Sequence, residues 1–456
     1  MSRRDQNRRR WLWLFLSLPL LCIVLYGFYR LPPVYSRLSW RVDELVTRVR
    51  YTFNPPDEAI FTPEQEEQLA LIVQATLNAL TPTAAPAATD QPATLEPGAP
   101  TPLPSATAVP LPPTVVLEGI TYVDQHGRWN YCGPANLTMA LKYWGWPGDR
   151  DDVARVVKPG VNEPNMDFIE RGKPDKNVMP YEMVDFVNDH TEYRALERDG
   201  GDIELIKRLL ANGFPVIIEK GYYEADYTGK VAWLGHYLFV TGYDEAGGYF
   251  IVQDAYLEPG RDLHSPFDEF IEGWRSFNFL FMVVYQPGDE ARLLETLGPW
   301  ADAQWASRHA LETANSEINL LTGNDQYFAW FNKGSSHVAL QQYVDAAFAY
   351  DYAFLLYSEL GGGSSQRPYR MLWYQTGPYW AYYYSGRYQD VINLANTTLF
   401  DTTVDPTLEE SLYWRGLARL AVGETDNAIA DFREAVYLNP NFSPGLDMLA
   451  QLGVSP

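Results

Sequence analysis

Cysteine and histidine are both scarce in this sequence, with two cysteines and six histidines among 456 residues. Cys22 lies within an apolar segment near the N-terminus and is badly placed to pair with Cys132, so we expect no disulfide in the folded part of the chain. A metal site could be formed by His126, His236 or His264 together with nearby acids, but these residues lack the spacing of zinc ligands. The sequence therefore predicts no metal and no cofactor.

Basic residues are also few, because 35 lysines and arginines stand against 58 aspartates and glutamates. The formal net charge is −23 at pH 7, and six of the arginines fall within the first 30 residues. Binding of nucleic acid requires a basic patch that neutralises phosphates. We therefore expect no nucleic acid among the partners of this protein.

One long hydrophobic run is present, at residues 11–29, where nineteen positions carry no charge. At 1.5 Å per residue such a helix spans the hydrocarbon core of a bilayer, so we predict one transmembrane helix. Five arginines precede it within residues 1–10, which we interpret as a cytoplasmic basic tail. The prediction is a single-pass protein of the cell membrane with its bulk extracytoplasmic. A cleaved signal peptide is the alternative, but no small-residue cleavage site follows the run.

Two segments of different composition follow the predicted membrane helix. Residues 30–80 are interpreted as a juxtamembrane stalk, in which an amphipathic helix begins after Thr62 and Pro63. Residues 81–114 are rich in proline, alanine and threonine and almost free of charge, so they cannot bury a core. We predict a disordered, extended linker there, which holds the rest of the chain away from the membrane.

Residues 115–287 show a helical half followed by a mostly antiparallel sheet, which is typical of an α+β domain. Gly247 and Gly248 stand between two strand patterns and indicate a hairpin. The predicted helices begin at Cys132 and cover 180–190 and 202–212, and the predicted strands are 215–219, 236–244, 249–256 and 277–285.

Residues 288–456 have a helical and repetitive pattern. Between 412 and 440, small, aromatic and proline residues recur at the spacing of the tetratricopeptide repeat, which this window resembles. Earlier, degenerate copies fit the same spacing with insertions between them. A generic helical bundle is the alternative interpretation.

Cys132 is the most informative residue, because Gly133 and Pro134 follow it as the start of a helix. Backbone N–H groups and the positive end of the helix dipole favour a thiolate at such a position, as a nucleophilic cysteine requires. A buried structural cysteine is the alternative.

A nucleophilic cysteine needs a base and a group that orients the base. His236 opens an apolar strand, and Asp254 lies on the next strand across the predicted hairpin. Antiparallel pairing would bring the Asp254 carboxylate beside the His236 ring, where it would fix the tautomer and stabilise the imidazolium. Cys132, His236 and Asp254 together indicate a catalytic triad.

The motif QHGRWNYCGPANLTMALKYWG at residues 125–145, followed by GHYLFVTGYD at 235–244 and a strand that ends in an aspartate, resembles the papain-fold peptidases of cysteine peptidase family 39. That family includes the bacteriocin-processing peptidases, and the resemblance covers residues 120–285. It implies Cys132 as nucleophile, His236 as general base, Asp254 as orienting acid and Gln125 as oxyanion-hole donor. Gln125 stands one residue further from the cysteine than in the processing peptidases, so Asp124 or Asn130 are alternatives for its place.

The expected architecture is thus an α+β papain-like cysteine peptidase domain followed by an all-α tetratricopeptide-type domain, behind one N-terminal transmembrane helix. The expected function is a membrane-anchored, extracytoplasmic cysteine peptidase, with a peptide or protein substrate and a protein partner bound by the helical repeats. Two alternatives stay open. The papain-like domain could hold a peptide without cleaving it, or it could serve as a scaffold for the repeats.

Overall fold

The computed structural model describes residues 26–31, 34, 42, 45, 49, 60–63, 110–128, 130–161, 178–225, 231–360, 367–368, 371–401 and 408–456. The predicted stalk helix and nearly all of the predicted membrane helix and linker lie outside these ranges. No helix within them is both long and apolar enough to cross a bilayer.

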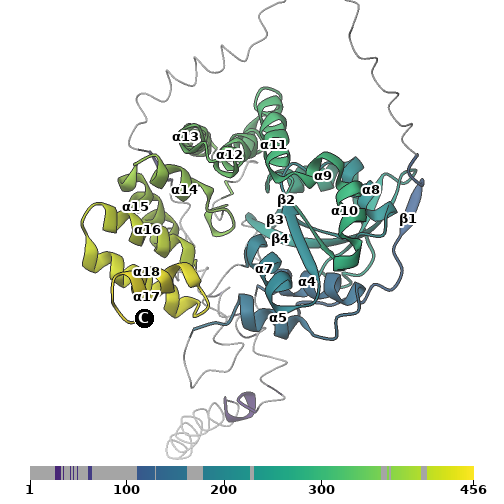
Figure 1. The fold of residues 1–456 in the computed structure, drawn as a ribbon, viewed down its shortest axis with the longest axis horizontal. Helices are drawn as coiled ribbons and strands as arrows, with labels where there is room; N and C mark the ends of the chain where they lie inside the picture. The colour runs from purple at the N-terminus through teal and green to yellow at the C-terminus, as the bar shows by residue number, and fades with distance from the viewer. Residues whose placement is uncertain are drawn as a thin grey trace, which may run out of the picture.

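Seven strands form a single antiparallel sheet in the order β2-β7-β3-β4-β5-β6, and β1 pairs with β4 beyond the end of β3. The long central hairpin of β3 and β4 dominates the sheet (Figure 1). The strands are β1 (Thr114–Val116), β2 (Arg194–Arg198), β3 (Val216–Ala225), β4 (Val231–Asp244), β5 (Tyr249–Gln253), β6 (Leu263–Pro266) and β7 (Phe281–Tyr285).

Helices cover both faces of this sheet and divide its core in two. One apolar cluster joins the sheet to α4, α5 and α7, and the other joins it to α8, α9 and α10. Aspartate side chains fix the starts of α5 and α8, where Asp149 and Asp202 accept hydrogen bonds from backbone N–H groups of the first turn. The helices are α4 (Cys132–Tyr143), α5 (Arg150–Val157), α7 (Pro180–His190), α8 (Ile203–Ala211), α9 (Phe267–Arg275) and α10 (Glu290–Leu297).

Several of these elements differ from the sequence-based predictions. β3 and β4 are longer than expected, because their ladder continues as far as the pair of Ala225 with Val231. Asp254 follows β5 instead of lying on it, and His236 lies inside β4 instead of opening it. α5 and the strands β1, β2 and β6 were not predicted. β1 includes Thr114, which the prediction assigned to the linker.

The C-terminal region is helical, as expected, and forms an arc that starts beside the sheet at α11 and ends at α17 and α18 (Figure 1). Its assignment to the tetratricopeptide family stays a prediction. The helices are α11 (Ala303–Glu317), α12 (Gly323–Ala339), α13 (Tyr343–Glu359), α14 (Gly377–Tyr384), α15 (Tyr388–Asn396), α16 (Glu409–Ala421), α17 (Thr425–Leu438) and α18 (Ser443–Gln451), with short 3₁₀ turns at Pro287–Asp289, Gly298–Ala301 and Met371–Trp373 and a π-turn at Thr397–Asp401.

The arc contacts the sheet domain at both of its ends. At the first end, Trp233 of β4 is 1% exposed. Its ring packs against the rings of Phe277, which follows α9, and of Phe328, which lies on α12 of the arc. At the far end, the Tyr181 hydroxyl on α7 donates to the Glu410 carboxylate on α16 at 2.5 Å. The helical region therefore contacts the sheet domain through aromatic packing at one end and through a hydrogen bond at the other.

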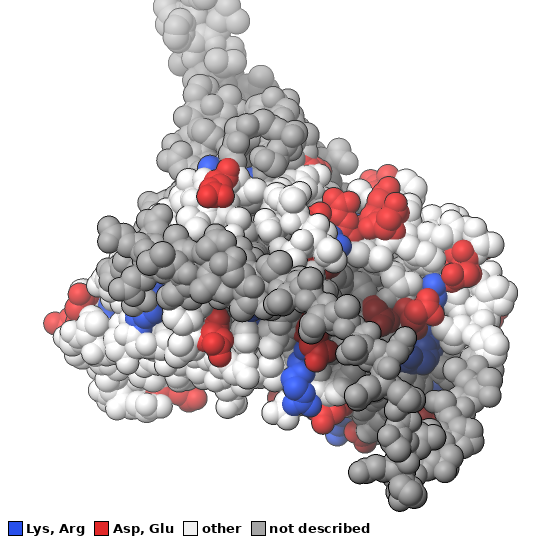
Figure 2. Space-filling view, turned by 90° about the horizontal axis from the view of Figure 1, so that it is seen from above, with Lys and Arg blue, Asp and Glu red and all other residues white. Residues whose placement is uncertain are grey.

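The surface reflects the acidic composition. Figure 2 shows acidic side chains spread over one face of the molecule, with fewer basic ones between them. The described residues visible on this face form no broad basic patch that could bind a polyanion.

Gly416 on α16 allows α17 to approach closely, because a Cβ atom there would lie 2.6 Å from the buried ring of Phe432. We expect Gly416→Val to lower the free energy of unfolding by about 1–3 kcal/mol more than Ala421→Val, an exposed position on the same helix. Chemical denaturation followed by circular dichroism measures both variants. Equal losses would show that this close packing contributes nothing.

Candidate active site

The first residue of α4 is Cys132, and α4 is fastened there to the middle of β4. The side-chain amide of Asn136 donates to the carbonyl oxygens of Cys132, at 2.8 Å, and of Tyr237, at 3.0 Å. The Tyr237 carbonyl is available because β5 ends opposite Phe239, so this stretch of β4 has no strand on that side. A short strand thus leaves room for the N-terminus of the helix that carries the cysteine.

His236 and Asp254 meet at the same place. The Nε2 atom of His236 lies 2.9 Å from Oδ1 of Asp254, and both side chains are buried. The Asp254 carboxylate also accepts hydrogen bonds from the backbone N–H groups of Tyr256 and Leu257, at 2.8 and 3.2 Å. Because Nε2 faces the aspartate, Nδ1 is the ring nitrogen left for the hydrogen bond with Cys132.

The protonation states of the three groups depend on one another. Burial alone would raise the pKa of the Cys132 thiol, but the hydrogen bond and charge of His236, with N–H groups of Tyr237 and Gly133, bring it below its usual value. Burial alone would lower the pKa of His236, but the charge of Asp254, the hydrogen bond to it and the contact with Cys132 raise it to about 10. Burial opposes the ionisation of Asp254, yet His236 and the loop N–H groups lower its pKa to about 2. The arrangement favours a thiolate beside an imidazolium at neutral pH.

Gln125 reaches the same region from the loop before α4. Its backbone N–H donates to the carbonyl of Ala255, the residue after Asp254, at 2.8 Å. The Gln125 side-chain oxygen is buried without a hydrogen-bond partner among the described residues. Of the two alternatives to Gln125, Asp124 is held by the Arg150 guanidinium, and Asn130 has a left-handed backbone with φ 51°.

Four residues near the site were not predicted from the sequence. The rings of Tyr222 and Tyr256 lie 6.0 and 6.2 Å from the His236 ring, measured between centroids. On β3, Lys220 pairs with His236 and Glu219 pairs with Tyr237. Burial and the charge of Cys132 raise the pKa of the buried Glu219 carboxyl well above its usual value, so that group is neutral. Of these four residues, only Glu219 had a signal in the sequence, because it is a charged residue at the end of the apolar run PVIIE.

The other histidines named above lie in different surroundings. The His126 ring contacts the Tyr256 carbonyl oxygen at 2.9 Å, and His264 stacks on Tyr249 with ring centroids 3.9 Å apart. In the described part of the chain, histidines, cysteines and carboxylates do not gather into a group of three or more that could hold a metal ion.

The pKa shifts predict the pH profile of alkylation of Cys132. Thiolate exists above the pKa of the thiol, so native Cys132 should react with iodoacetamide near pH 6 at least about tenfold faster than denatured protein. As the pH rises through about 10, the pKa of His236, the imidazolium loses its proton and the thiolate no longer has a cation beside it. Mass spectrometry of the peptide that contains Cys132 gives the rate.

His236→Ala should move this profile to higher pH, because it removes the main group that lowers the pKa of the thiol. The matched control is His264→Ala, whose ring lies against Tyr249 instead. A native rate no greater than the denatured rate would rule out an activated thiol.

Residues 117–282 match the model of the Peptidase_C39 like family. Two solved structures are similar to parts of the chain: a protein from Bacillus anthracis described as a C39-like peptidase (18% identity, TM-score 0.29, 38% of this chain and 96% of that one) and xylellain, a cysteine protease from Xylella fastidiosa (17% identity, TM-score 0.26, 39% and 87%). A search of curated proteins found no match. The family match supports a papain-like, C39-like peptidase fold for residues 117–282.

Proposed function

We propose that this protein is a cysteine peptidase that hydrolyses peptide bonds with Cys132, His236 and Asp254. The observation that carries the proposal is the convergence of the three groups at the start of α4, in β4 and just after β5, where His236 lowers the pKa of the Cys132 thiol. The match of residues 117–282 to a peptidase family model supports the same chemistry.

The proposed reaction begins with attack of the Cys132 thiolate on the carbonyl carbon of the scissile peptide bond. The C–N bond then breaks, and the His236 imidazolium gives its proton to the leaving amine. This leaves a thioester between Cys132 and the acyl part of the substrate. Neutral His236 next takes a proton from water, the resulting hydroxide attacks the thioester, and the carboxylic acid product leaves as the thiolate is restored.

Asp254 and Gln125 act on charge and orientation in this scheme. Asp254 holds Nε2 of His236, so that Nδ1 faces the cysteine, and its negative charge stabilises the imidazolium. The Gln125 amide and the backbone N–H of Cys132 are the proposed donors to the oxyanion of the tetrahedral intermediate. The position of the Gln125 loop, which is bonded to Ala255 beside Asp254, supports this role.

The proposal extends to the setting of the enzyme. The uncharged run at residues 11–29 and the arginines before it support a membrane anchor with the catalytic part outside the cytoplasm. We propose that the C-terminal helices bind a protein partner or present the substrate, as helical-repeat domains do. The contact between Tyr181 and Glu410 supports a helical region that acts close to the peptidase domain.

Substitution of the triad tests the proposal. A pool of peptides incubated with the protein should show cleavage products by mass spectrometry, and Cys132→Ala should abolish them. Asp254→Asn keeps the size of the side chain but removes its charge, so we expect a loss in kcat of about 10²-fold to 10⁴-fold. His264→Ala should keep its activity. Cleavage that survives Cys132→Ala would contradict the proposed mechanism, and tight peptide binding without cleavage would favour the peptide-binding alternative.

The oxyanion role of Gln125 has a separate test. Gln125→Ala should reduce kcat about 10-fold to 10³-fold with little change in KM, because the lost hydrogen bond forms only in the transition state. The same variant should alkylate at Cys132 at the unchanged rate, since that reaction develops no oxyanion. A parallel fall in both rates would assign Gln125 a structural role.

A further inference from the structure

A short piece of the N-terminal region packs into the helical region. Residues 60–63 lie in the segment predicted to be a juxtamembrane stalk, and Phe61 among them is only 5% exposed. Its ring packs edge to face against Phe354 on α13, with 5.0 Å between centroids, and lies 6.0 Å from the Tyr382 ring on α14. Phe61 therefore belongs to the apolar core of the helical region, from which it is distant in sequence.

The side chains around Phe61 come from several parts of the arc. Tyr327 of α12, Tyr357 of α13 and Leu394 of α15 contribute to the walls of this place, which we call the Phe61 site. Met371 belongs to it as well, from the short turn before α14. A cavity of only about 30 Å³ remains beside the ring, far less than the volume of sites that bind small molecules. Phe61 thus nearly fills the site.

The flanking residues show that the contact is made by a single anchoring side chain. Ile60 is 41% exposed and Thr62 is exposed, whereas Phe61 and Pro63 are buried. A large apolar side chain thus stays in solvent beside a ring that is enclosed. Recognition of a peptide segment by a groove commonly depends on a few anchors of this kind.

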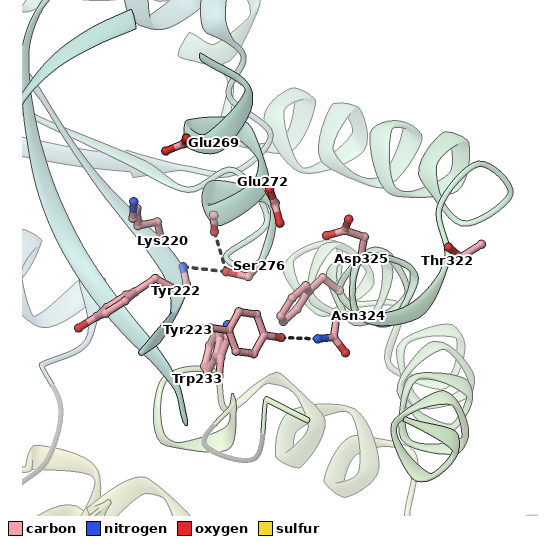
Figure 3. Close-up of a pocket in the computed structure, with 13 residues that line it drawn as sticks. Lys220, Tyr222, Tyr223, Trp233, Glu269, Glu272, Ser276, Thr322, Asn324 and Asp325 are labelled. Atoms are coloured by element: carbon pink, nitrogen blue, oxygen red, sulfur yellow. Dashed lines mark hydrogen bonds between the residues drawn. The ribbon is translucent and has the colours of Figure 1, made fainter. Parts of the chain in front are cut away.

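The Phe61 site lies beside the contact between the helical region and the sheet domain. Tyr327 lines the site, while the next residue of α12, Phe328, packs against Trp233 of β4. Figure 3 shows the start of α12 facing the central hairpin, where the Asn324 amide donates to the Tyr223 hydroxyl at 2.5 Å. Phe61 therefore contacts a part of the arc that is itself fixed to the sheet.

The chain that follows residues 60–63 is attached to the fold again at its other end. Residues 64–109 connect Pro63 to the segment before β1, where β1 pairs with β4 and the Tyr243 hydroxyl donates to the Pro112 carbonyl. A segment with both ends bound to one folded body closes a loop, and its length does not set the distance to anything outside that body. The proline-rich residues can act as a spacer from the membrane only when Phe61 is released.

We propose that the Phe61 site is the place where the folded part of the protein is held by its N-terminal anchor. The occupant is residues 60–63 of the same chain, with Phe61 as the anchoring side chain. The helical region, instead of β1, then receives the chain from the membrane, and residues 30–59 limit its distance from the bilayer to on the order of 100 Å. The docking is independent of the peptidase function, and only its relation to the bilayer rests on the proposed membrane anchor.

A distance between two spin labels tests the docking in the full-length protein. A background with Cys22→Ser and Cys132→Ala carries the labels at Thr62→Cys and Gln389→Cys, which are exposed positions in residues 60–63 and on α15. Double electron–electron resonance should give a narrow distribution of distances. A broad distribution would overturn the proposal.

Two alanine variants of the labelled protein identify the anchor. Phe61→Ala should broaden the distribution, because it removes the ring that fills the site, while Ile60→Ala, at the exposed neighbour, should keep it narrow. A narrow distribution in Phe61→Ala would overturn Phe61 as the anchor. The distribution with Phe61 in place decides the proposal if this variant does not fold. A narrow distance between copies that each carry one label would assign the docked segment to a second copy and overturn docking within one chain.

A synthetic peptide of residues 57–66 measures the site by fluorescence anisotropy. Full-length Phe61→Ala protein has a vacant site and should bind this peptide at least about tenfold more tightly than the same peptide with alanine in place of Phe61. The unmodified protein should bind it at least about tenfold more weakly than the variant does, because its own segment competes at a high effective concentration. Equal affinity of the variant for both peptides, or of both proteins for the first peptide, would overturn the proposal.

Deletions in lipid nanodiscs separate the docking from the membrane anchor on which its orientation rests. Energy transfer from a label at Gln389→Cys to a headgroup dye should be unchanged when ten residues are removed between 81 and 109. Removal of ten residues between 30 and 59 should raise it. A change with the first deletion would restore the proline-rich segment as the spacer and overturn the proposal. A narrow spin-label distance without energy transfer would leave the docking standing and remove the membrane anchor.

Discussion

The attachment of α4 to β4 is the constraint on which the candidate site depends. Asn136 bridges the carbonyl oxygens of Cys132 and Tyr237 through one amide group, and this contact is possible because β5 ends opposite Phe239. The same early end of β5 releases the chain at Asp254, which turns to meet His236. The early end of β5 thus makes room for the helix that carries the cysteine and for the aspartate that orients the histidine.

The charges at the site are balanced by burial as well as by pairing. His236 has an anion on each side of its ring, which explains an imidazolium that persists far above neutral pH. Glu219 is close enough to Cys132 for its pKa to respond to the charge of the thiol, yet it stays neutral because it is fully buried. A neutral Glu219 avoids a second anion next to the thiolate, whose repulsion would raise the pKa of the thiol.

Features with a strong local signal could be predicted from the sequence. Apolar periodicity with a proline start indicated α7 over its observed length, and Gly247 with Gly248 indicated the hairpin between β4 and β5. The start of α4 at Cys132 followed from the glycine and proline after it. β2 and α5 were missed because they are short and rich in charged residues, so that burial of one face gives them little apolar pattern.

The neighbours of the candidate site could not be predicted in the same way. Lys220 and Glu219 reach it only through the register of β3 against β4, and a shift of one residue would exchange which of them faces His236. Tyr374 approaches from the helical region: a Cβ atom on Gly235 would lie 2.8 Å from its ring. No local pattern relates residues so far apart in the chain.

The short strand β1 bears on how the protein would respond to mechanical load. Thr114 and Val116 pair with the end of β4, and the Tyr243 hydroxyl donates to the Pro112 carbonyl at 2.6 Å, so the proline-rich segment enters the fold through a clamp of hydrogen bonds. Tension carried along that segment would act first on these bonds, at the opposite end of β4 from Trp233. The clamp would yield before the ladder around His236, so the candidate site would keep its geometry.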